Sequence, residues 1–194
     1  MRKWFAIGLM IWAGNFSSAQ KPTDSLSYYS FEEALKADPD TIFAIDFTKD
    51  KRTELPEELK RFKKLKGLKL TKNKLTDLPD YFTEFKALKF IYADKNKFSY
   101  FPHQLFHLKK LVYIDLSRND MSSIPQGIKS LKNLVYLDVW DNPFTDIAPE
   151  MQELSQLQWI DLRGTTFSPT FVEKWTKAMP NTTIKFDKPC KCLE

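Results

Sequence analysis

The chain has 194 residues, of which 42% are hydrophobic and 14% aromatic, and only five are glycine. This composition excludes a disordered chain and a collagen-like one, and the length suits one domain with a hydrophobic core. Lysine and arginine number 30 against 25 acidic residues; without Arg2 and Lys3, which lie in a segment that we expect to be removed, 28 remain. That excess is too small to indicate nucleic-acid binding.

Residues 1–19 have the pattern of a secretory signal peptide. Arg2 and Lys3 precede an apolar stretch, and Ser17 and Ala19 are small residues three and one positions before the expected cleavage. The apolar stretch is shorter than the roughly 20 residues that cross a bilayer, although an uncleaved anchor is the alternative. We therefore expect cleavage after Ala19 and a secreted or periplasmic mature protein without a membrane span.

Residues 20–41 are expected to form a polar lead-in, up to residue 29, and then a short helix. Ser30 and Glu33 stand three residues apart, as in a capping box at a helix N-terminus. Pro39 is expected to stop the helix. Its predicted role is to cover the N-terminal edge of the fold.

The central part of the chain repeats itself every 23 residues. Two units contain LVYIDLSRND and LVYLDVWDNP, and all six units have apolar residues at their first, fourth and sixth positions. The units begin at Ile42, Leu65, Leu88, Leu111, Leu134 and Leu157. One unit cannot bury its apolar face alone, but stacked units can, so the period predicts a repeat architecture.

The ninth position of the four middle units is asparagine: Asn73, Asn96, Asn119 and Asn142. A turn that enters the interior after each strand leaves backbone groups without partners. A buried asparagine amide can donate to and accept from such groups. We therefore expect this asparagine column to be structural.

The pattern L-x-x-L-x-L-x-x-N-x-L resembles the leucine-rich repeat family, and its period resembles the 23-residue class found in Ras-suppressor-like and exported bacterial proteins. The resemblance covers residues 42–167. It implies an α/β solenoid, a curved right-handed coil with a parallel sheet on its concave face. The first and last units depart from the pattern, with Asp50 and Thr165 in place of asparagine, as expected where an end unit faces solvent.

Residues 168–194 are expected to form a C-terminal cap and a tail. Ser168 and Pro169 favour a helix start, and residues 182–186 are expected to add a last strand. In the tail, Cys190 and Cys192 are candidates for a disulfide within or between chains, because exported proteins meet oxidising conditions. A metal role for them lacks further cysteine ligands.

The odd positions of each strand are expected to point out of the concave sheet. In the last four units these positions carry aromatic and charged side chains, which are typical of interfaces. Alternatively, the rings stack on one another as ladders along the sheet. The residues proposed to bind a partner are Phe90, Tyr92, Tyr113, Asp115, Tyr136, Asp138, Trp140, Trp159, Asp161 and Arg163.

Three of these residues form an aspartate column: Asp115, Asp138 and Asp161. Strands about 4.8 Å apart would bring neighbouring carboxylates close to the spacing of retaining glycosidases. An open surface, however, is not expected to desolvate a carboxyl group enough to raise its pKa. A hydrolase is therefore the least favoured interpretation, and attraction of a basic partner is preferred.

Other chemistry is sparse in the sequence. His103 and His107 are expected to face solvent on the convex side, so we predict no metal site and no cofactor. The sequence predicts a non-enzymatic, exported leucine-rich repeat protein that binds a protein or other macromolecule through its concave face. A structural or adhesion element of the cell envelope is the alternative.

Overall fold

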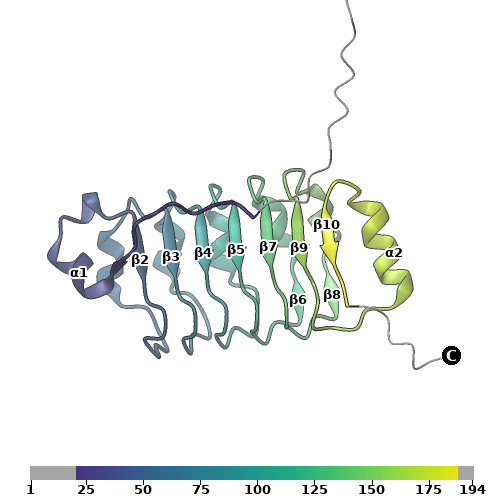
Figure 1. The fold of residues 1–194 in the computed structure, drawn as a ribbon, viewed down its shortest axis with the longest axis horizontal. Coiled ribbons are helices and arrows are strands. Elements are labelled where there is room, and N and C mark those ends of the chain that lie inside the picture. The colour runs from purple at the N-terminus through teal and green to yellow at the C-terminus, as the bar shows by residue number, and fades with distance from the viewer. Residues whose placement is uncertain (1–20, 188–194) are drawn as a thin grey trace, which may run out of the picture.

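The structure is a computed structural model that describes residues 21–187; the expected signal peptide and Cys190 and Cys192 lie outside the described residues. Parallel strands form one long sheet that runs the length of a curved coil (Figure 1). In spatial order the strands are β1 (Tyr29–Ser30), β2 (Ala44–Asp46), β3 (Gly67–Lys69), β4 (Phe90–Tyr92), β5 (Tyr113–Asp115), β7 (Tyr136–Asp138), β9 (Trp159–Asp161) and β10 (Thr183–Lys185).

The strand register reproduces the period of the sequence. Paired residues are the third positions of successive units, so that Ala44 lies beside Gly67 and Tyr113 beside Tyr136. The same register continues from Tyr136 to Trp159. The predicted parallel sheet is therefore confirmed, and each concave column consists of residues 23 apart.

The core lies between the sheet and the convex side. The fourth and sixth positions of every unit point into it and are buried, since side chains alternate between the two faces of a strand. These residues are Ile45, Phe47, Leu68, Leu70, Ile91, Ala93, Ile114, Leu116, Leu137, Val139, Ile160 and Leu162. Burying each large apolar side chain contributes about 1.5–3 kcal/mol of transfer free energy.

The asparagine column joins successive units. The amide of Asn119 donates to the carbonyl oxygens of Leu116 (2.9 Å) and Ala93 (3.2 Å), and its Oδ1 accepts the N–H of Phe98 (3.1 Å). The other three asparagines make the same pattern of bonds. In the last unit Thr165 replaces asparagine, and its hydroxyl donates to the Asn142 carbonyl (2.6 Å).

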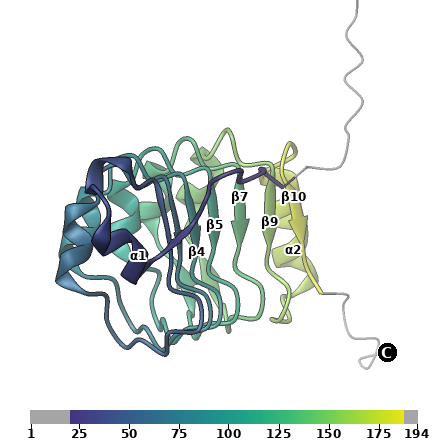
Figure 2. The ribbon, with the colours of Figure 1, turned by 60° about the vertical axis from the view of Figure 1, so that its left-hand side comes forward.

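Short 3-10 helices carry the chain along the convex side, which Figure 2 shows away from the strands. Four of them follow a proline, which cannot donate to a preceding turn and favours a helix start. These four are η2 (Glu57–Arg61), η3 (Asp80–Glu84), η4 (His103–His107) and η5 (Gln126–Ser130), and η6 (Pro149–Glu153) begins with a proline instead. Strand β6 (Ser123–Ile124), which precedes η5, pairs with β8 (Asp146–Ile147), which precedes η6.

A helix lies at each end of the sheet (Figure 1). Helix α1 (Phe31–Lys36) has the predicted capping box between Ser30 and Glu33 and is followed by η1 (Pro39–Thr41). Helix α2 (Pro169–Ala178) begins after Ser168, whose side chain accepts the N–H of Phe171. None of the helices in the described part of the chain is long and apolar enough to cross a membrane.

The eighth position of every unit has left-handed backbone geometry, a feature that the sequence analysis did not predict. Only the last unit has glycine there, with φ +94° at Gly164. The other five units place ordinary side chains in this conformation, which costs about 1–2 kcal/mol for an L-residue. They are Lys49, Lys72, Lys95, Arg118 and Asp141.

Candidate binding face

Residues 21–28 cross the concave face of the sheet, although the sequence predicted only a polar lead-in there. The purple trace in Figure 1 runs in front of β5, β4 and β3 before the chain enters the sheet as β1. Figure 2 shows the same segment outside the strands rather than within the sheet. We call residues 21–28 the crossing segment.

Alternate side chains of the crossing segment face the sheet. Pro22, Asp24, Leu26 and Tyr28 are half-buried, whereas the residues between them are exposed. This alternation is that of an extended chain lying on a surface. The sequence carries one sign of this alternation, Leu26 and Tyr28 two residues apart, within an otherwise polar stretch.

Asp24 is the polar centre of the contact. Its carboxylate accepts hydrogen bonds from the hydroxyl of Tyr92 on β4 (3.1 Å), the hydroxyl of Tyr28 and the N–H of Leu26 (3.0 Å). Burial, reinforced by the negative charge of Asp24, raises the pKa of both tyrosines. Both hydroxyls therefore stay protonated and act as donors at neutral pH.

Two lysines face aromatic rings at this contact. The Lys21 ammonium lies 4.7 Å from the ring centre of Tyr113 and 5.7 Å from that of Tyr136. From the sheet side, the Lys69 ammonium lies 3.9 Å from the ring centre of Tyr28. Cations at these distances are attracted to the ring face.

Gly67 lets the crossing segment approach the sheet. A Cβ atom at this position would lie 2.4 Å from the Tyr28 hydroxyl oxygen and 2.7 Å from Leu26 Cδ1. Any larger residue at position 67 would therefore displace the side chains of Leu26 and Tyr28. The glycine forms the floor on which Leu26 and Tyr28 rest.

Three of the predicted aromatic rings, those of Tyr113, Tyr136 and Trp159, stack in a column, and the rings of Phe90 and Tyr92 pack against Tyr113 at a tilt. Ring centres are 5.1 Å apart between Tyr113 and Tyr136 and 5.7 Å apart between Tyr136 and Trp159. The ring centres of Tyr92 and Tyr113 are 4.9 Å apart. Tyr113 is fully buried, whereas the rings of Tyr136 and Trp159 are half-buried and remain partly accessible. The rings therefore stack as ladders and also form part of the surface.

The aspartate column has a local structural role. One oxygen of each carboxylate accepts the N–H two residues further along: Asp115 from Ser117 (3.0 Å), Asp138 from Trp140 (3.1 Å) and Asp161 from Arg163 (3.1 Å). Asp161 is buried and also forms a two-pronged ion pair with the Arg163 guanidinium (2.6 and 2.9 Å). These bonds hold the carboxylates in line along the sheet.

The electrostatics of Asp115 and Asp138 differ from the sequence-based expectation of an open, solvated surface. Burial raises the pKa of Asp115, and burial together with the nearby charge of Asp115 raises the pKa of Asp138 to about 6. Both residues are half-buried on central strands of the sheet rather than open to solvent. The positive charge of Lys21 partly opposes both shifts.

Beyond the rings, Trp140 and its neighbours form the accessible end of the face. The guanidinium of Arg118 lies 4.4 Å from the Trp140 ring centre, and its Nε lies 3.8 Å from Asp141 Oδ2. Arg163 is exposed beside Asp161. Arginine stacked on tryptophan presents both a flat apolar surface and a fixed charge.

The remaining predicted sites lie elsewhere. His103 and His107 are exposed on the convex helix η4. Among residues 21–187, no three histidine, cysteine or acidic side chains are grouped so that they could hold a metal ion.

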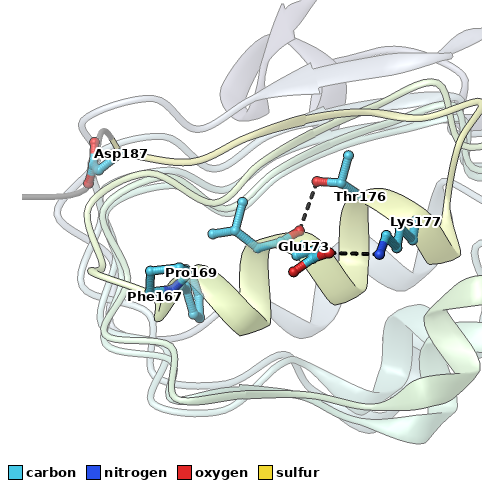
Figure 3. A pocket seen from close by; sticks show the side chains of 7 residues that line it. Phe167, Pro169, Glu173, Thr176, Lys177 and Asp187 are labelled. Carbon is cyan, nitrogen blue, oxygen red and sulfur yellow. Dashed lines mark hydrogen bonds and ion pairs between the residues drawn. The ribbon is translucent and has the colours of Figure 1, made fainter.

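An apolar hollow of about 400 Å³ lies beside α2 (Figure 3). Phe167, Pro169 and Val172 line it, and an ion pair between Glu173 and Lys177 (2.6 Å) borders it. It is remote from the crossing segment, and nothing in the structure shows what would occupy it.

No family model and no curated protein sequence matches the chain. Among solved structures, the chain is similar to a leucine-rich repeat protein of Leptospira interrogans, with 30% identity, a TM-score of 0.65, and coverage of 75% of this chain and 36% of that one. Internalin C2 of Listeria monocytogenes, with 18% identity and a TM-score of 0.64 over 76% of this chain and 62% of that one, shows the same fold.

A third similar structure is the leucine-rich repeat ectodomain of a plant membrane receptor kinase from Arabidopsis thaliana, in complex with Casparian strip integrity factor 2. It has 26% identity and a TM-score of 0.55 over 69% of this chain and 17% of that one. The chain spans less than two thirds of each of these three neighbours. Together with the repeat pattern, these likenesses show the leucine-rich repeat fold and support placing the chain among the leucine-rich repeat proteins.

Proposed function

We propose that the chain is an exported protein of the 23-residue leucine-rich repeat class that binds a protein partner through its concave face. In this proposal residues 42–167 are six repeats of a right-handed coil. The preceding residues 20–41 and the following residues 168–194 close the two ends, so that α1 and α2 act as caps. The aspartates bind and position; they do not catalyse.

The observation that carries this proposal is the stacked ring column beside aligned carboxylates on a concave sheet. Tyr136, Trp140 and Trp159 retain accessible surface next to the charged side chains of Asp138 and Arg163. Half-buried aromatic rings flanked by charges supply the apolar anchors and the polar rim of typical protein interfaces. Negative charge on Asp138 favours a basic partner.

Two further observations support the setting. The signal peptide pattern of residues 1–19 favours export, to the periplasm or the outside of the cell. One structural neighbour is an ectodomain in complex with another named factor, which supports a protein partner for this fold. Fold alone does not name the partner, so the proposal rests on the face itself.

A structural element of the cell envelope is the second candidate. It is favoured by the crossing segment, which already covers part of the concave face and leaves less of it free. In that case the repeats would mainly provide shape.

The two candidate functions are separated by a capture experiment. The mature chain and variants of its concave face are used to capture proteins from cell-surface and secreted fractions. Trp140→Ala and Trp159→Ala should each remove a captured protein or weaken its binding about thirtyfold, the usual effect of losing an anchor worth about 2 kcal/mol. Tyr100→Ala is the control, because Tyr100 is a 78% exposed aromatic side chain outside the strands. Equal capture by all variants would exclude concave-face binding and favour the structural element.

A further inference from the structure

The crossing segment is attached to the concave face by side chains alone. Among the described residues, no backbone hydrogen bond joins 21–28 to the strands beneath them, and pairing starts only at β1. Another peptide with the same side chains could therefore take this place without breaking the sheet.

The attachment points follow a fixed order along the segment. A cation, Lys21, faces the ring of Tyr113; an acid three residues later, Asp24, accepts from Tyr92. Leu26 and Tyr28 then rest on Gly67. Each sheet residue is thus complementary to one kind of side chain in an extended peptide.

We propose that the groove formed by Gly67, Lys69, Tyr92 and Tyr113 binds an extended peptide segment of a partner protein, and that the crossing segment is its tethered competitor. The partner segment carries a cation, an acid three residues further on, an apolar residue two after that and an aromatic residue two later. This inference rests on the proposed function and identifies the chemistry of the partner.

The groove offers an unused donor to such a peptide. The hydroxyl of Tyr113 is buried and has no hydrogen-bond partner within the described residues. A buried donor without an acceptor is unfavourable, so an occupant that supplies a carbonyl oxygen gains binding energy that the crossing segment does not. A partner peptide can therefore bind more tightly than the segment it replaces.

The tether argues against a second copy of this chain as the occupant. An attached segment competes at an effective concentration in the millimolar range. The same segment from another molecule makes the same contacts without that advantage and is outcompeted. Only a peptide with better contacts displaces the segment.

The probe for the test is a fluorescent synthetic peptide with the sequence KPTDSLSYY, residues 21–29. Its binding to the mature chain is measured by fluorescence anisotropy. The segment is loosened by combining Asp24→Ala with Tyr28→Ala, which removes two attachment points and leaves the buried core intact. Combined Ser25→Ala and Ser27→Ala is the matched control, because both serines face solvent.

The loosened variant should bind the peptide at least tenfold more tightly than the unaltered chain, and the serine control should behave like the unaltered chain. Adding Gly67→Ala to the loosened variant should weaken binding at least tenfold, because the new methyl group occupies the place of Leu26 and Tyr28. The unaltered chain should bind the same peptide only weakly, because the peptide makes the same contacts as the crossing segment without the tether.

Equal affinity for the loosened and unaltered chains, absence of binding to both, or no effect of Gly67→Ala would overturn the proposal. A concentration-dependent dimer of the unaltered chain that is lost on Asp24→Ala with Tyr28→Ala would assign the groove to a second copy and overturn the proposal as well. If the peptide fails in these ways while Trp140→Ala still abolishes partner capture, this inference fails and the proposed function stands.

Discussion

The carboxylate of Asp24 accepts a hydrogen bond of 3.1 Å from the hydroxyl of Tyr92, 68 residues further along the chain. The contact ties a segment outside the repeats to the middle of the sheet. Replacing either residue should weaken the attachment, but replacing both should cost less than the sum, because the second change removes a group that has already lost its partner.

A double-mutant cycle of Asp24→Ala and Tyr92→Phe should therefore give a coupling free energy of about 0.5–1.5 kcal/mol in denaturant unfolding. Thr71→Val with Asp24→Ala is the control pair, because the Thr71 hydroxyl bonds to Asp94 instead. Strictly additive effects for Asp24 and Tyr92 would show that the crossing segment is detached in solution.

Loss of one asparagine from the column should be costly. Asn119→Ala leaves the N–H of Phe98 without its acceptor. It also removes one of the two asparagine donors from the carbonyl oxygens of Ala93 and Leu116, which keep Asn96 and Asn142. The expected loss is about 1–3 kcal/mol in the free energy of unfolding. Thr165→Ala should cost less, since one hydrogen bond is removed at the end of the stack. A smaller effect for Asn119 than for Thr165 in urea titrations would contradict this account.

The left-handed position should respond in opposite ways to glycine and alanine. Lys72 has φ +59°, so Lys72→Gly should raise the free energy of unfolding by about 0.5–1 kcal/mol, the strain relieved less the entropy that glycine loses. Gly164→Ala should lower it by about 2 kcal/mol or more, because the new Cβ would lie 2.5 Å from the Asp141 Cα. Thermal melting of both variants tests the pair, and a stabilising Gly164→Ala would refute it.

Stability should depend on pH through Asp138. Its pKa in the folded chain is about 6, above the ordinary value, so the folded state favours the protonated form. The stabilising contribution is complete below about pH 4 and is lost as the pH rises through about 6. The charged groups that face it are Asp115, Asp161 and Lys21.

Asp138→Asn keeps an oxygen that accepts the N–H of Trp140 and removes the charge. The variant should melt at a higher temperature than the unaltered chain at pH 7.5, and the two should melt alike near pH 4. Asp146→Asn, at an exposed residue of β8, controls for loss of charge alone. If Asp138→Asn were less stable than the unaltered chain at pH 7.5, this carboxylate would be well solvated.

Substitutions at two neighbouring residues of β7 should differ in their cost to stability, because one side chain lies on the concave face and the other in the core. Leu137 is fully buried, and Leu137→Ala should cost about 2–5 kcal/mol. Tyr136 is half-buried and stacks on two rings, so Tyr136→Ala should cost about 1–3 kcal/mol, from two ring pairs of about 0.5–1.5 kcal/mol each. Equal melting temperatures for the two variants would mean that the ring column is as structural as the core.

The repeat architecture could be predicted because its determinants recur. Buried apolar residues such as Leu68 and Ile91 recur every 23 residues, so one unit that departs from the pattern does not hide it. The capping box of Ser30 and Glu33 could be found because both partners lie within one turn. Local and periodic constraints are therefore readable from the sequence.

The crossing segment could not be found in this way. Asp24 and Tyr92 have no counterparts in other units, so no periodic signal marks their contact. The alternation of the strands predicts an open concave face, so it predicts neither the burial of Tyr113 nor the raised pKa of Asp138. The left-handed backbone of Lys72 and Lys95 cannot be recognised from the sequence, because glycine, the usual sign of that conformation, is absent there.

The position of the crossing segment also imposes an order on folding. Each repeat needs only its neighbour to form, so the stack can grow unit by unit as the chain emerges. Residues 21–28 precede the repeats in the chain, yet they have nothing to dock on until β3, β4 and β5 exist. A segment that precedes the repeats in the chain therefore reaches its place only after they have formed, and until then its side chains are free to contact other molecules.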